Sequence, residues 1–258
     1  MHIPIMTTEI YDTLNDLNIN TIIDTTFGSG GHTKIFQKLN IKYIFAMDQD
    51  PLVVQYKIPN IPLVIDTFSN VNKYHSNYDF IFADLGMSTM QIEDTTRGFS
   101  FMRNGPLNMS MNINSSTDKL FHLLNREPIW TIEDILNKYG QVFNKSIISS
   151  IGRYRISNDI TDTAGLIRAC GTNEYKKLAK VFQALRIFIN DEMTELDLLL
   201  RHGNPSIGWG FLTFHSLEDN KIKHFSSGMR FKKLITPSKQ EIQNNPQSRS
   251  CRFRLLLK

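Results

Sequence analysis

Cysteines and long apolar runs are scarce in this chain of 258 residues, and each absence excludes a class of protein. The only two cysteines, Cys170 and Cys251, lie far apart and form no CxxC pair. They argue against a disulfide framework or a cysteine-based zinc site and suggest a reducing compartment. No apolar run approaches the ~20 residues that span a bilayer. The opening MHIPIMTTEIYDTL resembles neither a secretory signal nor an Arg- and Ser-rich transit peptide, so we expect no visible leader and no membrane partner.

The composition is that of a globular protein, with 41% hydrophobic and 21% charged residues. Lys and Arg number 29 against 25 Asp and Glu, which gives a formal net charge of +4. This balance is compatible with a polyanionic partner, although many basic proteins bind no nucleic acid.

The first half of the chain alternates short apolar runs with helical or loop segments, which is typical of a parallel α/β sheet. We predict strands at residues 21–24, 42–47, 61–65 and 79–83, with a helix from Gly31 and a short helix after Pro51. Right-handed crossovers would bring all four strand C-termini to one edge of the sheet, where open α/β sheets bind ligands.

The pattern changes after Gly98. Residues 112–180 contain no convincing strand but have helical spacing at 131–139, 146–155 and 163–170. They predict a small helical subdomain inserted into the α/β unit, which would comprise residues 1–111 and 181–258. One long amphipathic helix, KVFQALRIFINDEMTELDLLL, and a strand, GWGFLTF, are expected next, followed by the basic tail PQSRSCRFRLLLK.

A glycine cluster, IIDTTFGSGGHTKIF, follows the first predicted strand. It could form a plain tight turn, a phosphate cradle or a pocket for a nucleoside. The dinucleotide fingerprint GxGxxG fails at its third glycine, and the GK[ST] of a P-loop is absent. Asp24 before Gly28 would repel a pyrophosphate. It suits S-adenosylmethionine, which carries an ammonium and a sulfonium, and so favours a methyltransferase over a dehydrogenase.

Further acids follow the next strands. Asp48, in AMDQDP, is placed to accept hydrogen bonds from ribose hydroxyls, whereas Asp50 before Pro51 is better explained as a helix cap. Asp84, in FADLGMSTMQIED, would reach the same pocket, with a loop-capping role as the alternative. Phe68 either stacks on an adenine or packs in the core.

Eight segments of the chain resemble, in the same order, successive segments of the RsmH (MraW) family. They are HIPIMTTEI, TFGSGGHTK, MDQDP, DLGMSTMQIED, RGFSFMRNGPLNMSMN, FQALRIFINDE, FHSLEDNKIK and NNPQSRS. The residues in these segments are most similar to those of the mitochondrial methyltransferase-like branch. The resemblance implies an α/β fold with a Rossmann-like class I methyltransferase sheet. It also implies S-adenosylmethionine-dependent methylation of the exocyclic amine N(4) of a cytidine in small-subunit ribosomal RNA, without a metal.

The resemblance also implies cofactor contacts at Gly30, Gly31, His32, Asp48, Phe68, Asp84 and Gln91. It places the protein in the mitochondrial matrix, with the bacterial cytoplasm as the alternative, and the partner would be the assembling small ribosomal subunit. Where the family usually has acids and an arginine, this chain has Asn104, Asn108, Ser110 and Asn112. These departures favour a second hypothesis, an assembly factor with weakened catalysis.

On the substrate side, Phe99 and Phe101 could stack against the target base, with Arg97 in contact with a phosphate. Alternatively, the two phenylalanines could pack a loop against the sheet. Asn108 lies in the same segment. His215, in FHSLED, could reach the acceptor, although capping of the next helix by Ser216 and Glu218 explains the motif better. Lys145, Arg153 and Arg155 of the helical subdomain could contact RNA or form a solvated helix face. Asp84 is the candidate catalytic residue, as acceptor for the amine.

Overall fold

The structure is a computed structural model that describes residues 3–115, 118–142 and 145–258. It therefore leaves out His2, the first residue of the segments that carry the family resemblance. The chain divides into two compact units, which we call the sheet unit (residues 3–86 and 193–258) and the helical unit (residues 87–192). The predicted subdomain, 112–180, lies within the helical unit. No helix among the described residues is long and apolar enough to cross a membrane.

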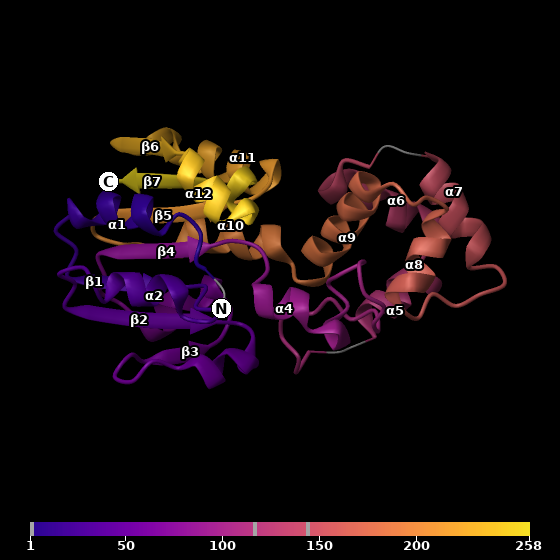
Figure 1. Cartoon of the computed structure of the whole chain (residues 1–258), viewed down its shortest axis with the longest axis horizontal. Helices are drawn as coiled ribbons and strands as arrows, with labels where there is room; N and C mark the ends of the chain where they lie inside the picture. The colour runs from indigo at the N-terminus through magenta and orange to yellow at the C-terminus, as the bar shows by residue number, and fades with distance from the viewer. Residues whose placement is uncertain (1–2, 116–117, 143–144) are drawn as a thin grey trace. The chain divides into compact units, whose positions relative to one another are not determined.

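The sheet unit contains one seven-stranded sheet with the strand order β3-β2-β1-β4-β5-β7-β6 (Figure 1). All pairs from β3 to β5 are parallel, and β7 runs antiparallel to both β5 and β6. The strands are β1 Thr21–Asp24, β2 Tyr43–Asp48, β3 Leu63–Ile65, β4 Phe80–Asp84, β5 Gly208–Thr213, β6 Phe231–Ile235 and β7 Arg252–Leu257. This order and direction confirm the predicted Rossmann-like class I methyltransferase sheet.

Helices cover both faces of this sheet. Apolar side chains of α1 and α2 pack with Ile22, Phe80 and Phe253 on one face, and those of α3, α10 and α11 pack with Ile23, Ile81 and Trp209 on the other. The helices are α1 Thr7–Asn15, α2 Gly31–Phe36, α3 Val71–Tyr74, α10 Glu192–His202, α11 Ser216–Phe225 and α12 Lys239–Asn244, with 3₁₀ turns at Pro51–Tyr56, Phe68–Asn70, Ser226–Gly228 and Pro246–Ser250.

The helical unit has its own apolar core, built around side chains such as Leu120, Leu136, Ile151 and Leu185. Its elements are α4 Thr89–Glu93, a 3₁₀ turn at Thr95–Arg97, α5 Lys119–Asn125, α6 Ile129–Gly140, α7 Lys145–Tyr154, α8 Thr163–Cys170 and α9 Tyr175–Ile189. The described residues of this unit form no strand, only an isolated bridge between Pro106 and Asp162. The predicted helical character of this insertion is confirmed.

Two sequence predictions about the second half of the chain were wrong or incomplete. The single long helix is in fact two, α9 and α10, because Asp191 takes a left-handed conformation with φ 51°. The tail described only as basic forms β7 between β5 and β6, with Phe253 and Leu255 buried while Arg252 stays exposed. The helix α1 and the strand β6 were also not anticipated.

Candidate functional site

Three carboxylates end three neighbouring parallel strands of the sheet unit. Asp24, Asp48 and Asp84 are the last residues of β1, β2 and β4, and β1 lies between the other two. Because the strands are parallel, the three residues lie along the same edge of the sheet, where ligands of open α/β sheets bind. The predicted placement of these strand ends is confirmed, while the roles assigned to the side chains stay predictions.

The turn after β1 is tied to the end of β2 by Asp48. The Gly28 N–H donates to Asp48 Oδ2 at 2.7 Å, and Gly28 has φ 54°. The other oxygen of Asp48 accepts from the Asp50 N–H at 2.9 Å, and Asp50 itself caps the following 3₁₀ turn, as predicted. Burial raises the pKa of Asp48 to about 6. The backbone of Gln49 also bonds to this carboxylate, so the three backbone bonds leave one of its four lone pairs for a further hydrogen bond.

Gly30 and Gly31 are required by the turn and by packing. Gly30 caps α2 with φ 76°, and a Cβ there would lie 2.9 Å from the Phe27 ring. A Cβ on Gly31 would lie 2.5 Å from Cγ of Pro4. The interpretation as a tight turn thus accounts for both residues, and their predicted cofactor contacts stay predictions.

Asp24 is held inside the turn and is only 1% exposed. The Thr33 hydroxyl donates to its Oδ2 at 2.5 Å, and the Thr26 N–H donates to its Oδ1 at 3.2 Å. Burial raises its pKa to about 6, against the lowering effect of these bonds and of His32. Asp24 therefore fixes the turn and adds a second titratable carboxyl to this edge.

His32 and Asp84 form a pair beside these groups. The imidazole Nε2 lies 2.9 Å from the Ile5 carbonyl oxygen, and Nδ1 lies 3.6 Å from Asp84 Oδ2. Burial lowers the pKa of His32, so the neutral ring donates Nε2–H to Ile5 and turns a bare Nδ1 towards Asp84. A bare Nδ1 is an acceptor only, so it can bond to Asp84 only when that carboxyl group is protonated.

The second oxygen of Asp84 distinguishes it from the other two acids. Burial first, and then the charge of Glu218, raises the pKa of Asp84 to about 7. Its Oδ1 is buried and finds no hydrogen-bond partner among the described residues. A buried acceptor of this kind is suited to a ligand that brings its own N–H.

Phe68 begins the 3₁₀ turn after β3 and is partly buried against the core on that face of the sheet. This contact agrees with the core-packing alternative, and stacking on an adenine stays a prediction. Asp66, directly after β3, is a fourth strand-end carboxylate that the sequence reasoning passed over. Its oxygens accept from Thr67, Asn70 and Tyr74, so they hold the turn together.

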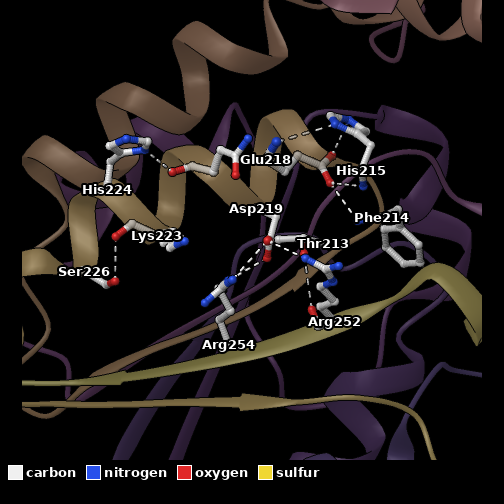
Figure 2. A network of polar contacts seen from close by, with 11 residues as sticks. Thr213, Phe214, His215, Glu218, Asp219, Lys223, His224, Ser226, Arg252 and Arg254 are labelled. Atoms are coloured by element: carbon white, nitrogen blue, oxygen red, sulfur yellow. Dashed lines mark hydrogen bonds and ion pairs between the residues drawn. The ribbon is translucent and has the colours of Figure 1, made fainter.

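His215 and Glu218 begin α11, after β5 (Figure 2). Glu218 Oε2 accepts from the Phe214 N–H at 2.8 Å, while His215 Nδ1 accepts weakly from the Glu218 N–H. The predicted capping by Glu218 is confirmed, but His215 is the cap residue and Ser216 is the first residue of the helix. A substrate contact of His215 stays a prediction. The effect of the Glu218 charge on Asp84 was not predicted from the sequence. It could have been, because Glu218 follows the fifth strand and so lies near the same edge of the sheet as Asp84.

In the helical unit, Gln91 and Arg97 are engaged with their own chain. Gln91 Oε1 accepts from the Ser88 N–H in a capping box at the start of α4. The Arg97 guanidinium is buried, with the residue 3% exposed, and donates to the carbonyls of Ser110 and Met111 at 2.8 and 2.9 Å. This geometry supports a structural role for Arg97 in place of the predicted phosphate contact. The cofactor contact of Gln91 stays a prediction.

The predicted base wall is also packed within the helical unit. Phe99 is buried in its core, and the Phe101 ring lies 5.0 Å from Tyr175 and 5.2 Å from Phe182, between centroids. Both contacts favour the packing alternative, most clearly for Phe99. Arg155, one of the three predicted RNA-contacting cations, donates to the Glu127 carbonyl at 2.7 Å.

The segment that departs from the family pattern is held by local hydrogen bonds. Asn108 Oδ1 accepts from the Ser110 N–H, and Asn112 Oδ1 accepts from the Asn114 N–H, each two residues further on. Asn104 Oδ1 accepts from the Ala164 N–H. An aspartate could accept the bonds of Asn108 and Asn112 with the same geometry, because an Asx turn needs only the side-chain oxygen. Asn104 differs, since its Nδ2 also donates to Asp162 Oδ2 at 3.1 Å, which an aspartate cannot do.

Comparison with known proteins decides the family. The sequence matches the model of the MraW methylase family over residues 1–231. The chain belongs to this family. It is 34% identical over 302 residues to the ribosomal RNA small subunit methyltransferase H of Wigglesworthia glossinidia brevipalpis, covering 98% of this chain and 97% of that protein. The family member of the same name from Neorickettsia sennetsu is 31% identical over 301 residues, covering 100% and 96%.

Among solved structures, an rRNA methylase from Streptococcus thermophilus is similar with a TM-score of 0.42 and 12% identity, covering 100% of this chain and 98% of that one.

Proposed function

We propose that this protein transfers a methyl group from S-adenosylmethionine to the exocyclic amine N(4) of a cytidine in small-subunit ribosomal RNA. Membership of the MraW methylase family and the names of the related proteins support this class of reaction. The observation that carries the proposal is the row of carboxylates, buried Asp24 and partly buried Asp48 and Asp84, at the strand ends around the turn at Gly28.

The charge of this row matches the cofactor. Three carboxyl groups along one edge disfavour a pyrophosphate and favour a nucleoside that carries a sulfonium and an ammonium. Asp48 has a lone pair left for a ribose hydroxyl, while its backbone bonds, including that from the Gly28 N–H, already fix its orientation. We further propose that Gly30, Gly31, His32, Phe68 and Gln91 contribute to the cofactor site, as the family resemblance implies.

Asp84 is the residue that we propose to act on the amine. S-adenosylmethionine supplies the activated methyl group, so that no metal is required. The chain must orient the amine and accept a hydrogen bond from it, because its lone pair is otherwise delocalised into the ring. The Oδ1 of Asp84 is a buried, unused acceptor, and Oδ2 lies 3.6 Å from Nδ1 of His32. Since burial raises the pKa of Asp84 to about 7, both protonation states occur near neutral pH.

The alternative function, an assembly factor with little catalysis, was suggested by the asparagines at 104, 108 and 112. The three carboxylates of the sheet unit are all present in this chain. Asn108 and Asn112 make Asx turns that an aspartate would also make. The substitutions at 108 and 112 therefore change the charge of the segment while keeping its local geometry, and the enzyme is the better-supported function.

The compartment is a separate proposal. We propose that the protein lies in the mitochondrial matrix, because the residues of its family segments resemble those of the mitochondrial branch. The bacterial cytoplasm is the alternative. Fractionation of the source cells with an antibody to this chain distinguishes them, since recovery outside mitochondria would contradict the first placement.

The test of the function uses labelled S-adenosylmethionine and small ribosomal subunits that lack the cytidine mark. We expect label in the ribosomal RNA and N(4)-methylcytidine in its nucleoside digest by mass spectrometry. Subunits that already carry the mark are the matched control and should accept no label. Binding of cofactor without any transfer, under conditions where a related methyltransferase transfers, would contradict the proposal and support the assembly factor.

A further inference from the structure

Positive charge is concentrated in the last 43 residues of the chain. Residues 216–258 hold ten Lys and Arg against three Asp and Glu, a net +7, whereas residues 1–215 hold 19 against 22, a net −3. The excess that gives the protein its overall charge of +4 therefore comes from this segment alone. A charge gradient of this size within one chain is typical of a surface that meets a polyanion.

The three acids of this segment do not neutralise its surface. Glu218 and Asp219 are buried, and Asp219 is bound by Arg252 and by a bidentate contact from Arg254. Glu241 accepts a hydrogen bond from the Met6 N–H and lies only partly exposed. The remaining cations thus face solvent without nearby compensation from these carboxylates.

Strand β6 presents the most compact group of these cations. It is the outermost strand on its side of the sheet, paired only with β7 (Figure 1). Residues 230–234, which we call the β6 edge, are all exposed: Arg230, Phe231, Lys232, Lys233 and Leu234. Within the described residues, none of the three cations lies at ion-pair distance from a carboxylate, and the Lys232 ammonium donates only to the Ser226 carbonyl.

Charges on an edge strand have a structural explanation, because lysines there prevent pairing with a second sheet. That explanation does not account for the apolar side chains of the same strand. Phe231 is 47% exposed and Leu234 is 46% exposed, although an edge protected against association has no need of either. Because side chains alternate along a strand, Phe231 shares its face with Lys233, while Arg230 and Lys232 lie on the opposite face of the same edge. An exposed aromatic ring next to cations is the combination by which single-stranded nucleic acids are bound, through base stacking and phosphate contacts.

We propose that the β6 edge is a docking surface for single-stranded RNA, in which Arg230, Lys232 and Lys233 contact phosphates and Phe231 stacks on a base. The outward backbone N–H groups of the unpaired strand edge supply additional donors, and phosphate oxygens are acceptors only. The surface lies in the sheet unit and shares no residue with the strand-end carboxylates. The proposal rests on the proposed function for the identity of the RNA, but its test needs no methyl transfer.

The test measures binding of the full-length chain to a short, fluorescein-labelled single-stranded RNA by fluorescence anisotropy at several salt concentrations. The triple variant Arg230→Gln/Lys232→Gln/Lys233→Gln should bind about tenfold or more weakly at low salt. The slope of log K against log salt should become shallower by about 2, since each lost phosphate contact removes about 0.7. The double variant Lys38→Gln/Lys42→Gln, which removes exposed lysines elsewhere in the sheet unit, is the matched control and should keep the wild-type slope.

A second variant separates stacking from charge. Phe231→Ala should weaken RNA binding about fivefold or more, because stacking on one aromatic ring contributes at least this much. It should leave binding of heparin, a polyanion without bases, unchanged. Calorimetry with S-adenosylhomocysteine on each variant reports that the sheet unit is folded, and failure of the wild type in that assay would concern the proposed function alone.

Three outcomes overturn the proposal. The triple variant could bind RNA with wild-type affinity and slope, or the lysine control could lose as much as the triple variant does. The triple variant could also lose binding to vesicles of anionic phospholipid while retaining RNA binding, which would assign the edge to a membrane surface.

Discussion

The two units of this protein treat their polar side chains differently. In the sheet unit, Asp24 is buried while Asp48 and Asp84 are partly buried, and the pKa values of all three carboxyl groups are raised. Asp84 Oδ1 has no hydrogen-bond partner among the described residues. In the helical unit, the Arg97 guanidinium donates to two backbone carbonyls and Asn108 accepts from the Ser110 N–H, so both side chains hold a loop. A carboxyl oxygen left without a partner is suited to a ligand, whereas a side chain bonded to the backbone of its own loop stabilises the fold.

The largest expected effect tests the sheet unit. Asp84→Asn should lower the rate of methyl transfer by a factor on the order of 100 to 1000, the usual cost of removing one preorganised hydrogen-bonding group at a reacting atom. The measurement is single-turnover transfer of labelled methyl groups. The surface substitution Asp197→Asn is the control and should keep the wild-type rate. Full activity of Asp84→Asn would remove Asp84 from the chemistry.

The matching test of the helical unit concerns stability. Arg97→Ala should lower the free energy of unfolding by about 3 kcal/mol, because two buried carbonyls lose their charged donor. Urea denaturation with a probe in this unit measures the change, and Arg103→Ala, at an exposed position nearby, is the control. If the Arg97→Ala protein had wild-type stability but bound RNA weakly, the result would support the predicted phosphate contact of Arg97. It would also contradict the difference proposed here between the two units.

The raised pKa values predict the pH dependence of cofactor binding. A folded-state pKa of about 6 for Asp24 and Asp48, against an ordinary 3.8, means that the cofactor-free fold binds more protons than the unfolded chain between these values. Its stability from these groups therefore falls as the pH rises from about 4 to 6. A cationic ligand favours the ionised carboxylates, so its affinity should rise with pH, by about fivefold per group between pH 5 and 6.

Calorimetric titration across this pH range measures the effect. In the same titrations Asp48→Asn, which cannot ionise, should show a shallower pH dependence than the wild type. Affinity that is constant from pH 5 to 7.5 would show that the carboxylates do not face the cofactor's charge.

The smallest effect is expected for Asn108→Asp. Because the Asx turn to Ser110 is kept, the free energy of unfolding should change by no more than about 0.5 kcal/mol, and the transfer rate should stay the same. Denaturation and transfer assays on this variant sharpen the comparison. A transfer rate raised tenfold by the restored acid would place this segment at the substrate and favour the hypothesis of weakened catalysis.

Sequence patterns predicted the elements that depend on local signals. The apolar runs located β1 to β5. Because parallel strands end at the same edge of a sheet, their direction also predicted that the aspartates ending β1, β2 and β4 lie along one edge. The capping roles of Asp50 and Glu218 followed from their positions before helices.

Features fixed by distant contacts could not be predicted from the sequence in this way. The break between α9 and α10 occurs where the Asn190 amide bonds to Met109 and Met111, some 80 residues earlier. Strand β7 is stabilised by pairing with β5 and β6, which a run such as RFRLLL does not reveal. The burial of Arg97 and Phe99 likewise depends on the core of the helical unit, which a local motif does not reveal, and their predicted RNA contacts stay predictions.

The central claim is that carboxylates at the strand ends hold a cationic nucleoside, and calorimetry tests it most directly. Titration of S-adenosylmethionine into the wild-type protein and into Asp48→Asn, each shown to be folded by circular dichroism, should give saturable heat for the first and an affinity lower by about tenfold or more for the second. Equal affinity of the two proteins, or no heat from the folded wild type, would contradict the account.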